Sequence, residues 1–116
     1  MKVSVIIPCF NEKKTIKQLI KKVNKINIKK EIIIIDDGSF DGTATILQKI
    51  KNKNKKKIFK KKNEGKGSAI KKALKFIKGD LVLIQDADLE YNPNDYYKLI
   101  KPFNDKKLMP FMVQEF

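Results

Sequence analysis

The sequence predicts an α/β fold with a Rossmann-like, mostly parallel sheet and helices on both faces. Two observations lead to this prediction. Short apolar, β-branched segments alternate along the chain with segments of helical periodicity, which is typical of a parallel sheet with crossover helices. One of these apolar segments, residues 31–38, is also apolar on both faces, as expected of a strand inside such a sheet. The chain has 116 residues, enough for one small domain with one core.

Four segments have the composition of buried strands. "VSVII", residues 3–7, is β-branched and is stopped by Pro8. "EIIIIDDG", residues 31–38, is apolar on both faces, as expected of a parallel strand covered on both sides. "KIFK", residues 57–60, is a weaker candidate, and "DLVLIQ", residues 80–85, is the fourth.

Four segments have helical spacing of their apolar residues. The first covers residues 12–27 and carries lysines on its other face. The next two cover residues 43–50 and 67–77. The last begins at Pro93, a favoured residue for a first helical turn, and runs towards Pro102.

The composition is strongly basic, with 27 lysines, no arginine and a net charge of +14. The densest block, "KNKNKKKIFKKK" at residues 51–62, is interpreted as solvated surface, with a contribution to anionic-membrane affinity as the functional alternative. The absence of arginine argues against nucleic acid as a partner. Cys9, the single cysteine, is expected to be a small buried residue. The chain contains no apolar run near the ~20 residues of a membrane span, so a cytoplasmic protein is expected, with a membrane-peripheral location as the alternative.

The acidic residues gather where strands are expected to end. Because ligands bind outside the carboxyl ends of strands in open parallel sheets, these residues predict a polar site on one rim. Eight of the 13 acids belong to this set: Glu12, Asp36, Asp37, Asp41, Glu64, Asp86, Asp88 and Glu90.

The segment "DADLE", residues 86–90, is the most informative part of this rim. Asp86 and Asp88 are two residues apart on a stretch that leaves a strand, and Glu90 follows. Two carboxylates placed in this way can share one hard divalent cation, whose coordination shell is completed by water and substrate phosphates. The sequence therefore predicts a site for Mg²⁺ or Mn²⁺ that bridges to a diphosphate.

These motifs have other possible interpretations. "DDGSFDG" has the composition of a turn in which Asp41 caps the next helix. A calcium loop counted from Asp37 fails, because its twelfth position is Gln48 and not a bidentate glutamate. "GKGS" lacks the spacing of a phosphate-binding loop.

Four motifs, "VSVIIPCFNE", "EIIIIDDGSFDGT", "NEGKGSAIKKAL" and "GDLVLIQDADLEYNP", together resemble the nucleotide-binding half of a family 2 glycosyltransferase of the GT-A fold. The likeness is strongest to the branch of dolichyl-phosphate mannose synthase and related polyprenyl-phosphate glycosyltransferases. It extends from Lys2 to about Phe103.

The resemblance implies a role for each matching residue. Phe10 would lie against the base or ribose, and Lys66 would approach a phosphate. The implied nucleotide-sugar-binding residues are Pro8, Phe10, Glu12, Ile35, Asp37, Asp86, Ala87 and Asp88, with Asp36 as an additional contributor. The implied metal ligands are Asp86, Asp88 and Glu90.

The implied reaction is inverting transfer of a sugar from a GDP- or UDP-sugar to an acceptor such as a polyprenyl phosphate at a membrane surface. Three alternatives remain open from the sequence. These are a donor-binding fragment without turnover, a nucleotidyltransferase, and a lysine-rich module that binds nucleic acid or anionic lipid. The second would need a Gly-rich, Arg-bearing loop after the first strand, and "PCFNE" has neither residue.

The last segment of the chain departs from the family pattern. We expect an incomplete glycosyltransferase domain at residues 1–105 and an atypical tail at residues 106–116. The resemblance implies a strand that ends in a small-Gly-Ser-Arg pattern at this place. Back-translation of residues 111–116, read two nucleotides later, can give Tyr-Gly-Ser-Arg-Ile. The sequence therefore predicts a frameshift near codon 107. No acidic residue after the metal motif lies in the sequence context expected of a catalytic acceptor base.

Overall fold

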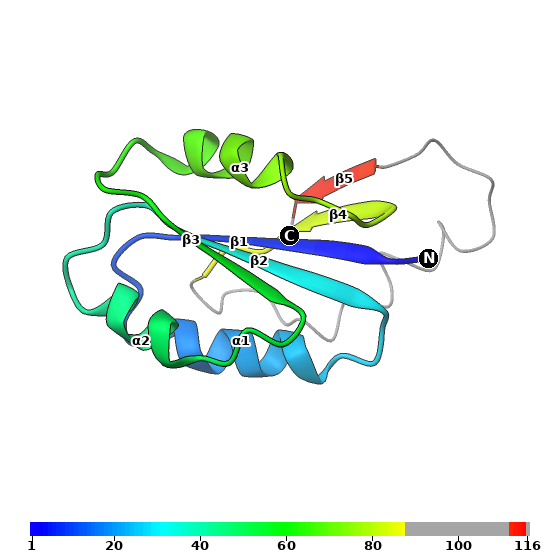
Figure 1. The fold of residues 1–116 in the computed structure, drawn as a ribbon, viewed down its shortest axis with the longest axis horizontal. Helices are drawn as coiled ribbons and strands as arrows, with labels where there is room; N and C mark the ends of the chain where they lie inside the picture. Colours follow the sequence, from blue (N-terminus) through cyan, green and yellow to red (C-terminus); the bar gives the residue numbers. More distant parts are fainter. Residues whose placement is uncertain (88–111, 116) are drawn as a thin grey trace.

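The computed structural model describes residues 1–87 and 112–115, and in this part of the chain five parallel strands form one sheet (Figure 1). Their order across the sheet is β3-β2-β1-β4-β5, so the first strand is central. The predicted Rossmann-like α/β fold is confirmed. The strands are β1 (Val3–Cys9), β2 (Lys30–Asp36), β3 (Lys55–Phe59), β4 (Leu81–Ile84) and β5 (Met112–Glu115).

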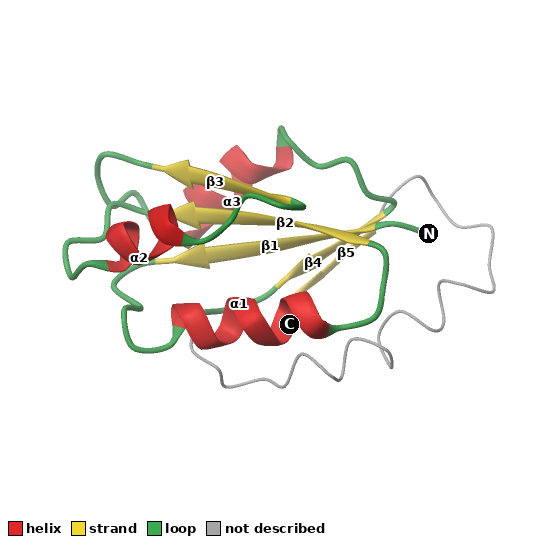
Figure 2. Ribbon diagram, turned by 60° about the horizontal axis from the view of Figure 1, so that its bottom comes forward, coloured by secondary structure: helices red, strands yellow, loops and turns green. Residues whose placement is uncertain are grey.

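Helices cover both faces of the sheet, as predicted. Helices α1 (Ile16–Lys25) and α2 (Thr43–Lys49) lie on one face, and α3 (Lys66–Leu74) lies on the other (Figures 1 and 2). The helix predicted after Pro93 lies outside the described residues. Within residues 1–87 and 112–115, no helix has the length and apolarity needed to cross a membrane.

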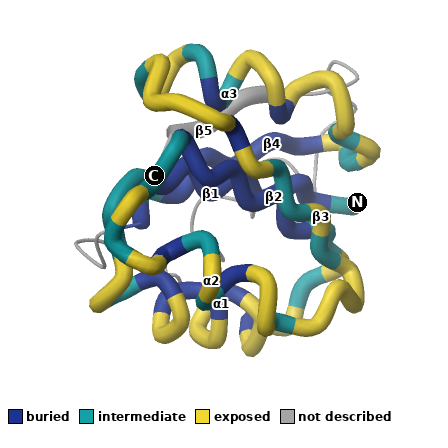
Figure 3. The backbone as a smooth tube through the Cα atoms, turned by 60° about the vertical axis from the view of Figure 1, so that its left-hand side comes forward, coloured by how far each residue is buried: buried dark blue, intermediate teal, exposed yellow. Residues whose placement is uncertain are grey.

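The core consists of two apolar layers, one on each side of the sheet. Because successive strand residues point to opposite faces, β1 supplies Val5 and Ile7 to the layer under α1 and α2, and Ile6 to the layer under α3. The α3 layer is completed by small helix residues, Ala69 and Ala73. Figure 3 shows the buried strands between helices whose outer surfaces are exposed.

The first strand does not stop at Pro8, as the sequence predicted, but continues to Cys9. The geometry of the sheet explains why a proline is tolerated there. The carbonyl of Ile6 accepts from the N–H of Gln85, whereas the carbonyl of Cys9 accepts from the N–H of Asp37 on the other side. By this alternation the nitrogen of Pro8 faces the β4 side, where pairing ends at Ile6, so no ladder hydrogen bond is lost.

The strand β5 was not predicted from the sequence. Met112–Glu115 pairs in parallel with Leu81–Ile84 of β4 and extends the sheet on that side. Part of the predicted atypical tail is therefore a strand, and the rest of that tail, like the predicted frameshift, lies outside what the described residues test.

Candidate functional site

A pocket of about 310 Å³ lies at the carboxyl ends of the strands, beside β1 and β4. After β1 the chain moves outward to β2 and β3 and then returns to place β4 on the opposite side of β1. This reversal of strand order opens a crevice at which ligands bind in open α/β sheets. The structure brings together six of the predicted site residues as lining of this pocket: Pro8, Phe10, Glu12, Asp37, Asp86 and Ala87.

The other predicted site residues are placed differently. Ile35 is fully buried in the core layer under α3 and does not line the pocket. Asp88 and Glu90 lie outside the described residues. The roles that the resemblance implies for these residues stay predictions.

The loop after β1 is joined to the loop after β2 by several hydrogen bonds. The backbone N–H of Asn11 donates to Ser39 Oγ over 2.8 Å, and the Asn11 side chain accepts from the N–H of Phe40 over 2.9 Å. The N–H of Glu12 donates to Thr43 Oγ1 over 3.1 Å. These bonds fix the loop that carries Phe10 and Glu12 into the pocket.

Two phenylalanines stand at this junction. The rings of Phe10 and Phe40 lie edge to face, with centroids 5.8 Å apart and planes at 75°. Phe40 is 83% exposed, whereas Phe10 is half-buried and lines the pocket. The exposed ring therefore supports one edge of the pocket-lining ring.

Asp41 stabilises the "DDGSFDG" turn but is not the cap of the next helix, as the sequence predicted, because the N-cap of α2 is Gly42 and has no side-chain cap hydrogen bond. Its carboxylate accepts from the backbone N–H of Thr43 at the start of α2 over 2.9 Å and from the N–H of Lys13 over 3.2 Å. Slight burial opposes ionisation, but the hydrogen bonds, led by that of the Thr43 hydroxyl, outweigh it and lower the pKa of Asp41. This carboxylate is therefore used inside the loop and does not line the pocket.

Asp37 joins the end of β2 to the loop after β3. It is buried, and its Oδ2 accepts from the N–H of Gly65 over 2.8 Å while its Oδ1 accepts from the N–H of Glu64 over 3.1 Å. Its Oδ1 also forms an ion pair with Lys60 Nζ at 3.1 Å. Asp37 therefore holds one wall of the pocket in place as well as lining it.

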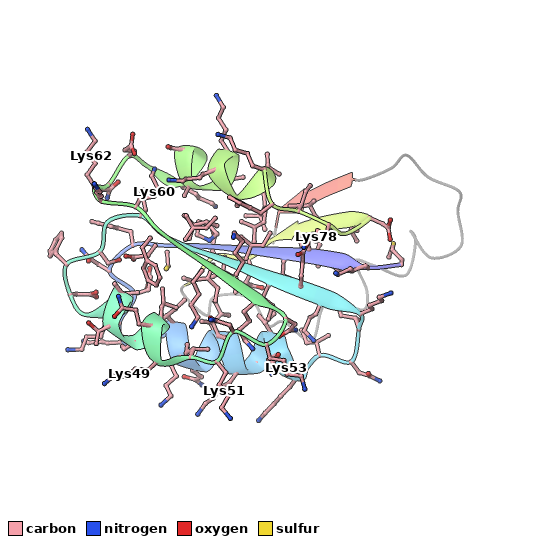
Figure 4. The ribbon with its side chains drawn as sticks, viewed as in Figure 1. Lys49, Lys51, Lys53, Lys60, Lys62 and Lys78 are labelled. Atoms are coloured by element: carbon pink, nitrogen blue, oxygen red, sulfur yellow. The ribbon has the colours of Figure 1, made fainter. Side chains whose placement is uncertain are left out.

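Lys60 supports the pocket through its ion pair with Asp37, and the sequence did not predict this role. Its block was interpreted as solvated surface, and for Lys60 this was wrong, because the side chain is only 4% exposed. The ammonium contacts Asp37, Glu64 at 3.2 Å and Ser68 Oγ at 2.9 Å, and Figure 4 shows it beside α3 while Lys62 reaches outward.

The electrostatics of Lys60 follow from these contacts. Burial alone would lower its pKa, but the hydrogen bonds to Asp37 and Glu64 outweigh burial and raise the pKa. The sequence carries only a partial signal for this residue, because strand periodicity gives the face of its side chain but not its ion pair with Asp37. Lys60 is two positions after Ile58, which packs on the α3 side, so strand periodicity places both on the same face.

Gly38 allows the loops after β2 and β3 to touch. Its φ is +76°, and a Cβ at this position would lie 2.5 Å from the carbonyl carbon of Lys62 and 2.6 Å from the nitrogen of Asn63. No side chain fits at these distances without a shift of the backbone. The glycine therefore permits the close approach that brings Asn63 to the pocket wall.

Asp86, the first carboxylate of the predicted metal motif, lies at the end of β4. Its Oδ1 is 2.6 Å from Nζ of Lys66, the first residue of α3, and both side chains are partly exposed. The next residue, Ala87, is tied to α1 because its carbonyl accepts from the Thr15 hydroxyl over 2.8 Å. Among the described residues there is no cluster of three or more metal-ligating side chains, and two of the three predicted ligands are not among them.

Cys9 lines the pocket at the end of β1, and Asp36 is the last residue of the neighbouring strand β2. Cys9 is buried, as predicted, and its thiol donates to the carbonyl of Ile35 over 3.5 Å. Burial raises its pKa, and the charge of Asp36 adds to this effect, so the thiol is protonated. Asp36 Oδ1 is buried without a hydrogen-bond partner among the residues that the structure describes.

Sequence comparison identifies a match to the family described as "Glycosyl transferase family 2" over residues 4–113. The chain is 35% identical over 104 residues to a dolichol-phosphate mannosyltransferase of Pyrococcus furiosus. This match covers 87% of this chain and 30% of that protein. The chain spans less than half the length of the curated relatives it matches.

Two solved structures show the same fold. One is Staphylococcus aureus TarS, residues 1–349, in complex with UDP, with a TM-score of 0.78, 32% identity, and coverage of 90% of this chain and 32% of that one. The other is the mannosyltransferase PcManGT of Pyrobaculum calidifontis in complex with GDP-Man and Mn²⁺. Its TM-score is 0.72 at 26% identity, and the match covers 80% of this chain and 29% of that one.

Proposed function

The chain belongs to glycosyl transferase family 2, and we propose that it binds a GDP- or UDP-sugar in the pocket at the ends of β1 and β4. One observation carries the proposal. An aromatic ring, two carboxylates and a lysine from four different chain segments converge on this pocket: Phe10, Asp37, Asp86 and Lys66. The likeness to structures that contain UDP or GDP-Man supports this class of ligand.

The nucleoside end of the ligand is proposed to lie between the first two loops. Phe10 offers an apolar ring against the base or ribose, with Pro8 and Glu12 beside it. Asp37 is the proposed acceptor for the base or ribose. Its Oδ2 accepts one hydrogen bond, from Gly65, and a carboxylate oxygen can accept more than one.

Of the three predicted metal ligands, the described part of the chain contains Asp86, whose chemistry fits a divalent cation. Asp86 is a carboxylate at the pocket edge that already attracts a cation, the ammonium of Lys66. Carboxylate oxygens are the ligands that Mg²⁺ prefers. We propose that Asp86, Asp88 and Glu90 hold Mg²⁺ or Mn²⁺. When bound, the metal would neutralise the diphosphate leaving group.

The proposed reaction is inverting transfer of the sugar. The acceptor oxygen forms a bond to the anomeric carbon from one face while the bond to the diphosphate oxygen breaks on the other. A polyprenyl phosphate, the acceptor class suggested by the name of the Pyrococcus furiosus relative, is already an anion and needs no general base. The chain's own part is to bind and orient the donor through Phe10, Asp37 and Asp86.

Titration calorimetry tests the proposal. UDP, GDP and their sugars are titrated into the protein with Mn²⁺ and again with EDTA. We expect binding of one nucleotide series that weakens strongly in EDTA. Asp88→Asn, which keeps the side-chain shape but removes a charge, should weaken metal-dependent binding. Equal nucleotide affinity in Mn²⁺ and in EDTA, or unchanged nucleotide affinity in Asp88→Asn, would contradict the proposed metal-dependent site.

A further inference from the structure

We propose that Lys66 is a resident cation on Asp86 that competes with a divalent metal, so that the free protein binds metal weakly. This inference rests on the proposed function, because it concerns the same pocket. It adds that Lys66 competes with the metal for Asp86, and that this competition sets the metal affinity of the protein when no nucleotide is bound.

The contact that carries the inference is short and positioned by the fold. Lys66 Nζ lies 2.6 Å from Asp86 Oδ1, the distance of a charge-assisted hydrogen bond. Gly65, the residue before it, has a φ of +99° and donates its N–H to the buried Asp37. The start of α3 is thereby fixed, and the lysine reaches the end of β4 from there.

The position of Lys66 on its helix is unfavourable without such a partner. The N-terminus of a helix carries a partial positive charge, so cations are disfavoured in the first turn. Helix α3 begins with this lysine and has no acidic residue in its first turn. The carboxylate of Asp86 offsets both the helix charge and the lysine charge, which explains why the ammonium is directed into the pocket.

An ammonium and a divalent cation compete for this carboxylate. If both contacted Oδ1 they would lie within a few ångströms of each other and would repel strongly. The two oxygens of one carboxylate are close together, so a metal on either oxygen is repelled by the ammonium, and metal entry is favoured when Lys66 leaves Asp86. The diphosphate of an incoming nucleotide provides an alternative anionic partner for the lysine, so nucleotide and metal are expected to favour each other's binding.

The size of the effect follows from exposure. The two side chains are 43% and 31% exposed, so solvent screens the pair. A partly exposed ion pair of this kind changes an equilibrium by about two- to fivefold. Lys66 thus weakens metal binding without abolishing it, as an exchangeable counter-ion should.

The test uses Mn²⁺ alone, followed by electron paramagnetic resonance without nucleotide. Lys66→Gln should bind Mn²⁺ about two- to fivefold more tightly than the natural protein, and Lys66→Arg should not. Lys72→Gln, which removes an exposed lysine of the same helix, is the matched control and should change little. In an Asp86→Asn background the effect of Lys66→Gln should disappear, as in a double-mutant cycle.

Three results would overturn the inference. These are an unchanged Mn²⁺ affinity in Lys66→Gln, an equal increase of Mn²⁺ affinity in Lys72→Gln, or no detectable Mn²⁺ binding by both the natural protein and Lys66→Gln. The first two leave the nucleotide proposal intact, because calorimetry with UDP and GDP tests that proposal separately. Conversely, tighter Mn²⁺ binding in Lys66→Gln without any nucleotide binding would support the counter-ion and reject the proposed function.

Discussion

Replacing Gly38 by alanine tests the close approach on which the pocket wall depends. At this glycine the backbone is left-handed, and a Cβ would lie 2.5, 2.6 and 2.8 Å from three backbone atoms of Lys62 and Asn63. Gly38→Ala is therefore expected to lower the free energy of unfolding in two ways, through the unfavourable backbone conformation of alanine and through a steric clash. The contacted atoms belong to the backbone, so no side chain can rotate away to relieve the clash.

Gly42 separates the two costs. Its φ is +102°, but a Cβ there would meet only the Lys13 side chain, at 3.7 Å, an ordinary contact. Gly42→Ala should therefore show the conformational cost alone, about 1–2 kcal/mol for a left-handed non-glycine residue. Gly38→Ala should cost at least ~1 kcal/mol more, because the backbone after β3 must move.

Urea unfolding followed by circular dichroism measures both variants against the natural protein. For a chain of this size, about 1 kcal/mol corresponds to a melting shift of ~4 °C, so the two variants should be distinguishable thermally as well. Gly38→Ala should also weaken nucleotide binding, since Asn63 and Gly65 line the pocket. An equal loss of stability in the two variants would contradict the close approach of the loops after β2 and β3 at Gly38.

Three further predictions concern Lys60, Cys9 and Phe40. Because the folded pKa of Lys60 is raised above its ordinary 10.5, its stabilising contribution is complete below that pH and is lost as pH rises through the folded pKa. The stability deficit of Lys60→Met should therefore shrink in urea titrations above about pH 10.5, and a constant deficit would contradict the buried ion pair. The protonated, buried Cys9 thiol should react with a thiol reagent at pH 8 only in denaturant; rapid reaction in buffer would place it at the surface. Phe40→Ala should change stability by less than ~0.5 kcal/mol because the ring is exposed, yet weaken nucleotide binding by about three- to tenfold through loss of the edge-to-face support. A normal affinity in calorimetry would show that Phe10 needs no such support.

The elements of the fold could be predicted because each has a strong local pattern. The four successive isoleucines Ile32–Ile35 are typical of a strand covered on both faces. The spacing of the apolar residues in α1 likewise indicates which side of that helix is buried. The predicted start of α1 at Glu12 is wrong, since the helix begins at Ile16. The carbonyl of Glu12 accepts from the N–H groups of Thr15 and Ile16, which forms a turn before the helix.

What the sequence could not reveal depends on contacts between distant segments. The burial of Lys60 requires Asp37 from another strand end, and in a chain so rich in lysine the residue type gives no warning. The tolerance of Pro8 depends on where β4 stops pairing. The strand β5 has no alternating pattern and is defined by its pairing with β4.

The same contacts decide which residues can separate binding from stability. Asp37 contacts the loop after β3 through two backbone N–H groups and a buried ammonium, so a change there alters the pocket and the fold together. Phe40 and Lys66 are different, because both are exposed and neither is part of the core. Substitutions at these two positions should therefore change ligand binding while the unfolding transition stays where it is. In this pocket, substitution of the exposed residues Phe40 and Lys66 can change ligand affinity while the stability of the sheet is kept, because buried residues such as Asp37 hold the loops in place.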